Sequence, residues 1–346
     1  MSTKTTMKFV GLGLLSTLPF MAPQAASGQE LVVYCGVQEE WCRPMMQAFE
    51  RKTGVKVLMT RKSAGEIYAQ LKAEASNPRA DVWWGGTGDP HLQAAEEGLT
   101  EPYKPAILSE LQPWALKQAE TAKNRTVGIY AGGLGYSFNT EQLAKRKLPE
   151  PKCWADLTKA DYKDEVQVAD PNASGTSYNM LATMVQLMGE QQAFDYLKAM
   201  HKNVNQYTKT GAAPARAVST GESVIGITFM HDAVTEAVNG APVKVVSPCE
   251  GTGYEIGSMS LIKGAKNMDN AKKFYDWALT PEAQNLGAAA KAYQVPSNKN
   301  SKTPPQAPKL TDIKLIDYDF AKYGSSAERT RLLAKWDAEV RNAPKR

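Results

Sequence analysis

Two short polar segments of the sequence carry residue types that bind anions at the start of a helix. In the first, at 61–63, an arginine and a lysine precede Ser63, and Glu66 follows three residues later. In the second, at 174–176, two hydroxyl residues flank a glycine, which lets the backbone approach a ligand closely. Helix N-termini present unpaired N–H groups to negative charge, so both segments predict a site for a phosphate or a phosphonate. The alternative for Ser63 is a simple helix cap, because Glu66 completes a capping box.

Three further polar residues, His231, Asp232 and Glu255, could bind the other end of such a ligand. Carboxylates accept hydrogen bonds from hydroxyl groups or from a protonated amine, and a histidine can donate or accept. This chemistry suits a sugar or an aminoalkyl group beyond the phosphorus. The alternative is that His231 and Asp232 only cap the helix that follows the strand predicted at 224–229.

Catalysis by Ser174 or His231, in an exported hydrolase, is a different interpretation of the same residues. Ser174 lacks the two-glycine frame of a nucleophile elbow, and no histidine and acid can be matched to it from spacing. None of the three histidines of the chain stands at a Cys/His metal spacing. We therefore expect a binding protein that is not an enzyme and carries no metal or cofactor. An exported phosphoesterase is the alternative from another class.

The four cysteines, Cys35, Cys42, Cys153 and Cys249, predict two disulfide bonds if the chain is exported. Four cysteines allow three pairings. Cys35 ends an apolar run at 31–34 and Cys42 falls in the first turn of the following helix, so a local bridge between them would lock that corner. Cys153 and Cys249 would then form the second bridge.

The N-terminus has the three parts of a secretory signal peptide. Two lysines precede an apolar run at 9–21, and small residues follow this run. The run is shorter than the roughly 20 residues that span a bilayer, and no cysteine follows it to carry a lipid. The sequence predicts a signal peptide at 1–28, cleaved between about Ala25 and Gln29, and a mature protein in the periplasm.

The spacing of apolar residues predicts the strands and helices that would position these side chains. Strands and helices alternate along the chain, and the β-α-β-α-β order at its start, with short connections, predicts an α/β fold with a mostly parallel sheet between helices. Strands are predicted at 31–34, 55–59, 82–84, 166–169, 224–229, 243–246 and 256–262, and helices at 41–49, 63–75, 176–187, 271–279, 281–289 and before residue 336.

The composition is that of a soluble globular protein, with 42% hydrophobic and 22% charged residues. A chain of 346 residues is long enough for two domains, because single cores rarely exceed about 250 residues. The formal charge is 41 − 36 = +5, which is too small and too dispersed for a nucleic-acid footprint. We therefore expect no nucleic-acid partner.

Four segments of the chain resemble the type 2 periplasmic solute-binding proteins of ABC transporters, in the branch that includes ferric-ion and sugar-phosphate binding proteins. They are the opening LVVYCGVQEEW, the block AFERKTGVKVLMTRKSAGEIYAQLKAEASNPRADVWWGG, the turn DPNASGTS and, near the C-terminus, NAKKFYDWALTPEAQ. The resemblance covers nearly the whole mature chain, and it is far more specific for the superfamily than for the ligand. It implies a monomer that binds a small anionic solute, with an ABC permease and its ATPase as partners.

The resemblance also implies two α/β domains, each a mixed, mainly parallel sheet flanked by helices, with a ligand cleft between them that closes by a hinge. One domain would be discontinuous, formed by 29–132 and 257–346, and the other would span 133–256. The chain would cross between the domains near Gly133 and near Ile256. The candidate ligand-binding residues at the cleft are Gln38, Arg61, Lys62, Ser63, Gly86, Thr87, Asn172, Ser174, Gly175, Thr176, His231, Asp232 and Glu255.

The same resemblance separates two classes of ligand. Sugar-phosphate binders of this branch contact their ligand with a histidine, an aspartate and a later glutamate at the spacing of His231, Asp232 and Glu255. Iron binders supply two adjacent tyrosines where this chain has Phe229 and Met230. We therefore expect capture of a small phosphorylated or phosphonate solute, either a sugar phosphate or an aminoalkylphosphonate. A ferric-ion-binding protein is the alternative.

Overall fold

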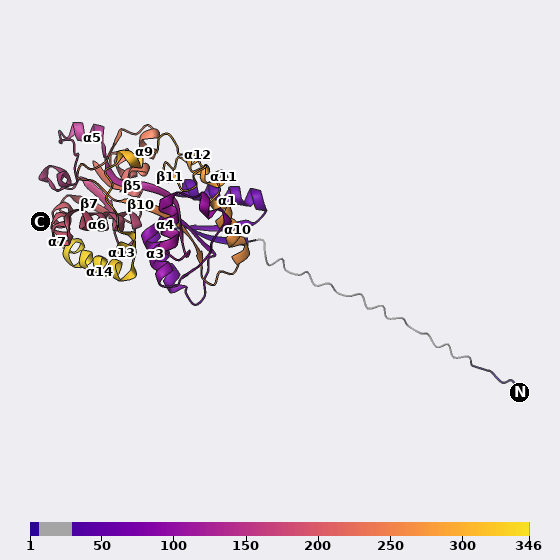
Figure 1. The fold of residues 1–346 in the computed structure, drawn as a ribbon. Coiled ribbons are helices and arrows are strands. Elements are labelled where there is room, and N and C mark those ends of the chain that lie inside the picture. The colour runs from indigo at the N-terminus through magenta and orange to yellow at the C-terminus, as the bar shows by residue number, and fades with distance from the viewer. Residues whose placement is uncertain (7–29, 346) are drawn as a thin grey trace.

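The computed structural model describes residues 1–6 and 30–345, and Figure 1 shows the arrangement of its elements. The apolar run and the cleavage region of the predicted signal peptide lie outside these residues. The strands are β1 Glu30–Cys35, β2 Lys56–Arg61, β3 Val82–Thr87, β4 Thr100–Glu101, β5 Val127–Asn139, β6 Val166–Ala169, β7 Val204–Thr208, β8 Ile225–Phe229, β9 Val243–Val246, β10 Tyr254–Ile262 and β11 Val295–Pro296. The helices are α1 Glu39–Thr53, α2 Ala64–Ala73, α3 Gly88–Glu96, α4 Pro113–Thr121, α5 Thr140–Lys145, α6 Gly175–Met188, α7 Glu190–His201, α8 Ala213–Thr220, α9 Met230–Val238, α10 Met268–Ala278, α11 Pro281–Gln284, α12 Leu286–Ala289, α13 Phe320–Tyr323 and α14 Ser326–Trp336, which a π-helical turn Asp337–Arg341 continues.

The strands form one mixed sheet with the order β2-β1-β3-β10-β5-β8-β6-β7. β1 pairs in parallel with β2 and β3, and β6 pairs in parallel with β7 and β8. In the middle of the sheet, β5 pairs antiparallel with both β10 and β8. The predicted α/β fold is confirmed, and the parallel pairing expected from the sequence is found in the two outer parts of the sheet.

The long strand β5 runs through both halves of the sheet. Its first part, 127–133, pairs with β10, and its second part, 134–138, pairs with β8. Each half has its own hydrophobic core, one containing Phe49 and Phe274 and the other containing Phe194. The strand therefore changes partner and core where the sequence places a crossing of the chain.

The C-terminal segment packs on the second half of the molecule. Leu332 and Trp336 of α14 are fully buried in the core that also contains α6, α7 and β8. Figure 1 shows α14 near α7, and Arg331 donates hydrogen bonds to Glu190 at the start of α7. The sequence assigns 257–346 to the first domain, whereas this segment joins the second core. The division into domains stays a prediction.

The structure contains both expected disulfide bonds. Cys35 at the end of β1 is bonded to Cys42 in α1, and Cys153 is bonded to Cys249 in the loop between β9 and β10. The first bond fixes the turn between β1 and α1, which forms part of the wall described below. Within residues 1–6 and 30–345, no helix has the length and apolar character needed to cross a membrane.

Candidate ligand-binding site

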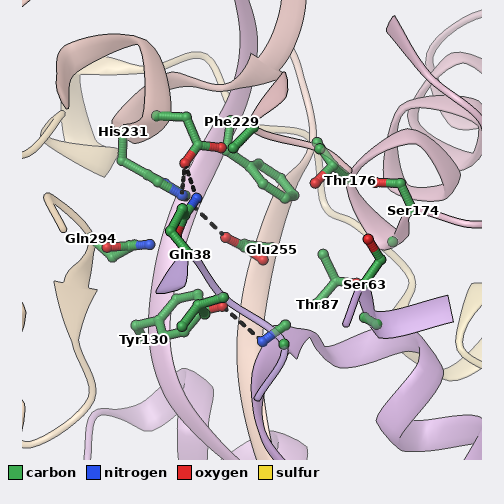
Figure 2. Close-up of a pocket in the computed structure, with 18 of the residues that line it drawn as sticks. Gln38, Ser63, Thr87, Tyr130, Ser174, Thr176, Phe229, His231, Glu255 and Gln294 are labelled. Atoms are coloured by element: carbon green, nitrogen blue, oxygen red, sulfur yellow. Dashed lines mark hydrogen bonds and ion pairs between the residues drawn. The ribbon is translucent and has the colours of Figure 1, made fainter. Parts of the chain in front are cut away.

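A cavity of about 50 Å³ is lined by residues from both halves of the molecule (Figure 2). Most of the predicted ligand-binding residues line it: Gln38, Arg61, Ser63, Gly86, Thr87, Ser174, Gly175, Thr176, His231, Asp232 and Glu255. The other two predicted residues point elsewhere. Lys62 Nζ donates to Gln70 Oε1, and Asn172 Nδ2 donates to the carboxylates of Asp170 and Asp337.

Six helices begin at the wall of this cavity, because the residue before the first turn of each one lines it. These residues are Gln38 before α1, Ser63 before α2, Thr87 before α3, Ser174 before α6, Ala212 before α8 and Phe229 before α9. The aligned peptide dipoles give each helix N-terminus roughly half a positive charge, together with unpaired N–H groups. The backbone therefore makes the cavity attractive to an anion.

Hydroxyl groups gather at one end of the cavity. Figure 2 shows Ser63, Thr87, Ser174 and Thr176 together at this end, which we call the anion end. The side chain of Ser174 makes no capping hydrogen bond to α6, and Thr87 Oγ1 is buried without a partner among the described residues. Hydroxyls that are free beside helix N-termini suit the oxygens of a phosphate.

Gly175 brings the two walls of the anion end into close contact. A Cβ atom at this position would lie 1.7 Å from Thr87 Oγ1 and 2.9 Å from Thr87 Cβ. The sequence predicts that this glycine lets the backbone approach a ligand. In the structure it also lets the start of α6 approach the end of β3 on the opposite wall.

Arg61 and Ser63 add side-chain contacts at the cavity wall. Arg61 Nε donates to Val37 O at 2.9 Å, and burial lowers the arginine pKa, although a guanidinium keeps its charge at neutral pH. Ser63 N–H donates to Glu66 Oε2 at 3.0 Å, as the helix-cap interpretation predicts. Ser63 Oγ donates to Lys209 O at 2.9 Å and so bridges the two walls.

The opposite end of the cavity holds His231, Asp232 and Glu255, which we call the acidic end. His231 Nε2 lies 3.7 Å from Asp232 Oδ1 and 3.7 Å from Glu255 Oε1. Gln38 Nε2 donates to Asp232 Oδ1, and Thr228 Oγ1 is hydrogen-bonded to Asp232 Oδ2 at 3.0 Å. Figure 2 shows Gln38, His231 and Glu255 converging from different segments of the chain.

Burial controls the protonation of the acidic end. It lowers the pKa of His231 to about 3, so the imidazole is neutral at pH 7. It raises the pKa of Asp232 to about 7 and that of Glu255 well above its usual value, where the negative charge of Asp232 adds to the effect. His231 Nδ1 has no partner among the described residues. The acidic end therefore offers both donors and acceptors, which is the pattern that recognises hydroxyl groups.

Tyr130 and Gln294 also line the cavity, and neither was predicted from the sequence. Tyr130 OH accepts a hydrogen bond from Gly86 N–H at 3.1 Å and so ties β5 to the end of β3. Gln294 lies in the loop before β11 and faces the acidic end in Figure 2. Neither residue belongs to a local motif that could have marked it, because only the packing of β5 and β11 brings them to the cavity.

A second cavity, of about 320 Å³, adjoins the acidic end and shares His231 and Asp232 with the first. Arg216 and Glu40 line it, and Arg216 Nη2 lies 3.0 Å from Glu40 Oε1. This ion pair joins α8 to α1 across the opening. The adjoining space gives room for an organic group that extends beyond the anion end.

A cavity between two α/β halves, walled by strand ends and helix N-termini, defines a solute-binding protein with the type 2 periplasmic fold. The chain belongs to the bacterial extracellular solute-binding protein family, which it matches over residues 78–323. Proteins of this family are the substrate-binding, non-enzymatic components of ABC importers and work in the periplasm.

Close relatives match nearly the whole chain. An uncharacterized protein of Haemophilus influenzae is 47% identical over 345 residues, which is 97% of this chain and 100% of that protein. The periplasmic binding protein AfuA from Actinobacillus pleuropneumoniae, solved with exogenous fructose 6-phosphate bound, is 46% identical with a TM-score of 0.88, covering 91% of this chain and 99% of AfuA. The periplasmic binding protein P5PA is 40% identical with a TM-score of 0.87, covering 90% of this chain and 99% of P5PA.

Proposed function

We propose that this chain is the solute-binding component of an ABC importer for a sugar phosphate. The observation that carries the proposal is the convergence of six helix N-termini on one cavity that has free hydroxyls at one end and a His-Asp-Glu cluster at the other. The likeness to AfuA, solved with fructose 6-phosphate bound, supports the same class of ligand.

The phosphate binds at the anion end. Its oxygens accept hydrogen bonds from the first N–H groups of α6 and from the hydroxyls of Ser174 and Thr176, and Arg61 balances part of the charge. The sugar extends toward the acidic end, where its hydroxyls exchange hydrogen bonds with Asp232 and Glu255.

The protonation of the acidic end favours a sugar over an aminoalkyl group. A protonated amine binds best to ionised carboxylates, whereas burial raises the pKa values of Asp232 and Glu255 and so favours their neutral forms. Ferric ion is disfavoured by the lining residues. Fe(III) prefers anionic oxygen ligands, and Tyr130, the tyrosine that lines the cavity, has a pKa raised well above its usual value by burial and by Glu255.

Native mass spectrometry of protein purified from the periplasm without refolding tests the proposal, because a co-purified solute adds its own mass. Calorimetry and thermal melts with fructose 6-phosphate, 2-aminoethylphosphonate and ferric citrate then compare the three classes of ligand. A ligand that binds only the folded protein stabilises it by about 2.7 kcal/mol at a hundredfold excess over Kd. We expect this shift with the sugar phosphate, and a shift with ferric citrate alone would overturn the proposal. A parallel phosphate-release assay should show no turnover.

We further propose that the signal peptide is removed, that the mature protein acts as a monomer, and that it delivers its solute to a permease and ATPase. Closure occurs about the two crossings near Gly133 and Ile256, between a first domain at 29–132 and 257–346 and a second at 133–256. The C-terminal helix α14 belongs to the first domain in this division, but it stays packed on the second core during closure. Small-angle scattering tests closure, because the radius of gyration should fall when fructose 6-phosphate is added.

A further inference from the structure

The turn at 170–174 leads into α6 and sets the direction of its first N–H groups. Asp170 Oδ1 accepts a hydrogen bond from Asn172 N–H at 2.9 Å, and Asp170 O accepts hydrogen bonds from the N–H groups of Ala173 and Ser174. The opposite wall touches the same turn, because a Cβ atom at Gly65 would lie 2.7 Å from Ala173 O. A small rotation of this turn would therefore move the start of α6 at the anion end.

The C-terminal π-helical turn contacts this segment with two charged side chains. Arg341 Nη1 lies 3.1 Å from Asp170 Oδ2, and Asp337 Oδ1 accepts a hydrogen bond from Asn172 Nδ2 at 2.9 Å. Each contact engages one of the two residues whose own hydrogen bonds shape the turn. Asn172, which is predicted from the sequence to contact the ligand, thus links the C-terminal π-helical turn to the anion end.

The π-helical turn is well placed to hold these side chains still. Asp337 and Arg341 lie four residues apart, and Arg341 Nη1 is 3.7 Å from Asp337 Oδ1, so both face the same turn. Trp336 and Val340 are fully buried in the second core and anchor the backbone between them. A short stretch of π-helix changes the phase of a helix, and such stretches are frequent at functional sites.

We propose that Asp337 and Arg341 are positioning residues for the anion end. They fix the turn through Asn172 and Asp170, so that the first N–H groups of α6 point into the cavity, and they do not touch the solute. This inference rests on the proposed phosphate site at the start of α6. It gives the last helix of the chain a part in ligand affinity, although that helix contributes no residue to the cavity wall.

Arg341→Ala and Asp337→Ala test the inference, with Arg331→Ala as a matched control. Arg331 is also on the C-terminal segment, and its side chain has the same exposed fraction of 47%, but it pairs with Glu190 and Glu328 away from the turn. Calorimetry should show that both test variants bind inorganic phosphate and fructose 6-phosphate more weakly by the same factor, about twofold to thirtyfold. The control should bind like the wild type, and Arg341→Lys should recover part of the loss. A loss confined to fructose 6-phosphate would place the effect at the acidic end and overturn the inference.

Hydrogen exchange on the ligand-free protein tests, without any solute, whether Arg341 fixes the start of α6. The amides at 173–178 should exchange faster in Arg341→Ala than in the wild type, and Arg331→Ala should leave them unchanged. Unchanged exchange at 173–178 in Arg341→Ala would overturn the inference. If the wild type binds neither phosphate nor fructose 6-phosphate, the proposed function fails. The exchange rates still show whether Asp337 and Arg341 fix the turn at 170–174.

Discussion

Replacing Gly175 by alanine should block closure of the cavity without unfolding the protein. Gly175 is the first residue of α6 and is not among the glycines with positive φ, so alanine fits the local backbone and is a better helix former. The obstacle is the opposite wall. The added Cβ would lie 1.7 Å from Thr87 Oγ1 and 2.9 Å from Thr87 Cβ, far inside ordinary contact distance.

The size of the effect follows from how this clash can be relieved. Thr87 is β-branched and buried, so its side chain has little freedom to turn away, and the walls must separate instead. Forcing an extra methyl group into a packed site costs about 1 to 3 kcal/mol. If the walls separate in the ligand-free protein, as the proposed closure requires, the cost should appear as an affinity for fructose 6-phosphate that is about five- to 150-fold weaker.

Calorimetry with fructose 6-phosphate measures this loss, and a thermal melt of the ligand-free variant checks that the fold is intact. The control is a double-mutant cycle with Thr87→Gly, which removes both clashing atoms. In that background Gly175→Ala should cost little further affinity. If Gly175→Ala binds like the wild type, or if its cost is the same with and without the Thr87 side chain, the reasoning from close contact is wrong.

Three further predictions follow from the site and the disulfides. Asp232→Ala should weaken fructose 6-phosphate binding, by about 0.5 to 1.5 kcal/mol for a neutral hydrogen bond, and leave inorganic phosphate binding almost unchanged. Ser174→Ala should weaken both in calorimetry, by about 1.5 to 3 kcal/mol, because its hydroxyl donates to a charged phosphate. Burial raises the pKa of Asp232 from 3.8 to about 7, so between these pH values the folded protein holds a proton that the unfolded chain has released. The contribution of this group to stability is fully present below about pH 4 and is lost progressively as the pH rises to about 7. Asp232→Asn should therefore melt higher than the wild type at pH 8 and show a smaller gain at pH 4; the same difference at both pH values would contradict the assignment. Joint replacement of Cys153 and Cys249 by alanine should lower the free energy of unfolding by about 2 to 4 kcal/mol in denaturant titrations, since their bond closes a long loop; peptide maps that join either residue to another cysteine would contradict the pairing.

The parts of the site that lie next to each other in sequence could be predicted well. The hydroxyls and the glycine of the turn before α6 predict the start of that helix. The predicted start of α2 is confirmed by the hydrogen bond between Ser63 and Glu66. The local disulfide between Cys35 and Cys42 could also be predicted, because a strand end and the next helix turn lie close in any α/β unit.

The parts of the fold and of the site that depend on long-range packing could not be predicted from the sequence. β5 is buried along its whole length, so it lacks the alternation that marks a half-exposed strand, and its glycines weaken its propensity as well. Strand β5 was therefore not predicted, and neither was Tyr130, which lies in it. The packing of Leu332 and Trp336 in the second core could not be predicted either, because amphipathic spacing indicates that they are buried but not which core receives them.

The six helix starts around the cavity have a consequence for how its selectivity can change. Main-chain N–H groups are present at every residue except proline, so no single substitution can abolish the attraction of six helix starts, and a shift of pH cannot titrate it. The acidic end also depends on three side chains that can each be exchanged in one step. Main-chain attraction for the anion is thus combined with side chains that single substitutions can change. Redesign for other organic phosphates would begin at His231, Asp232 and Glu255.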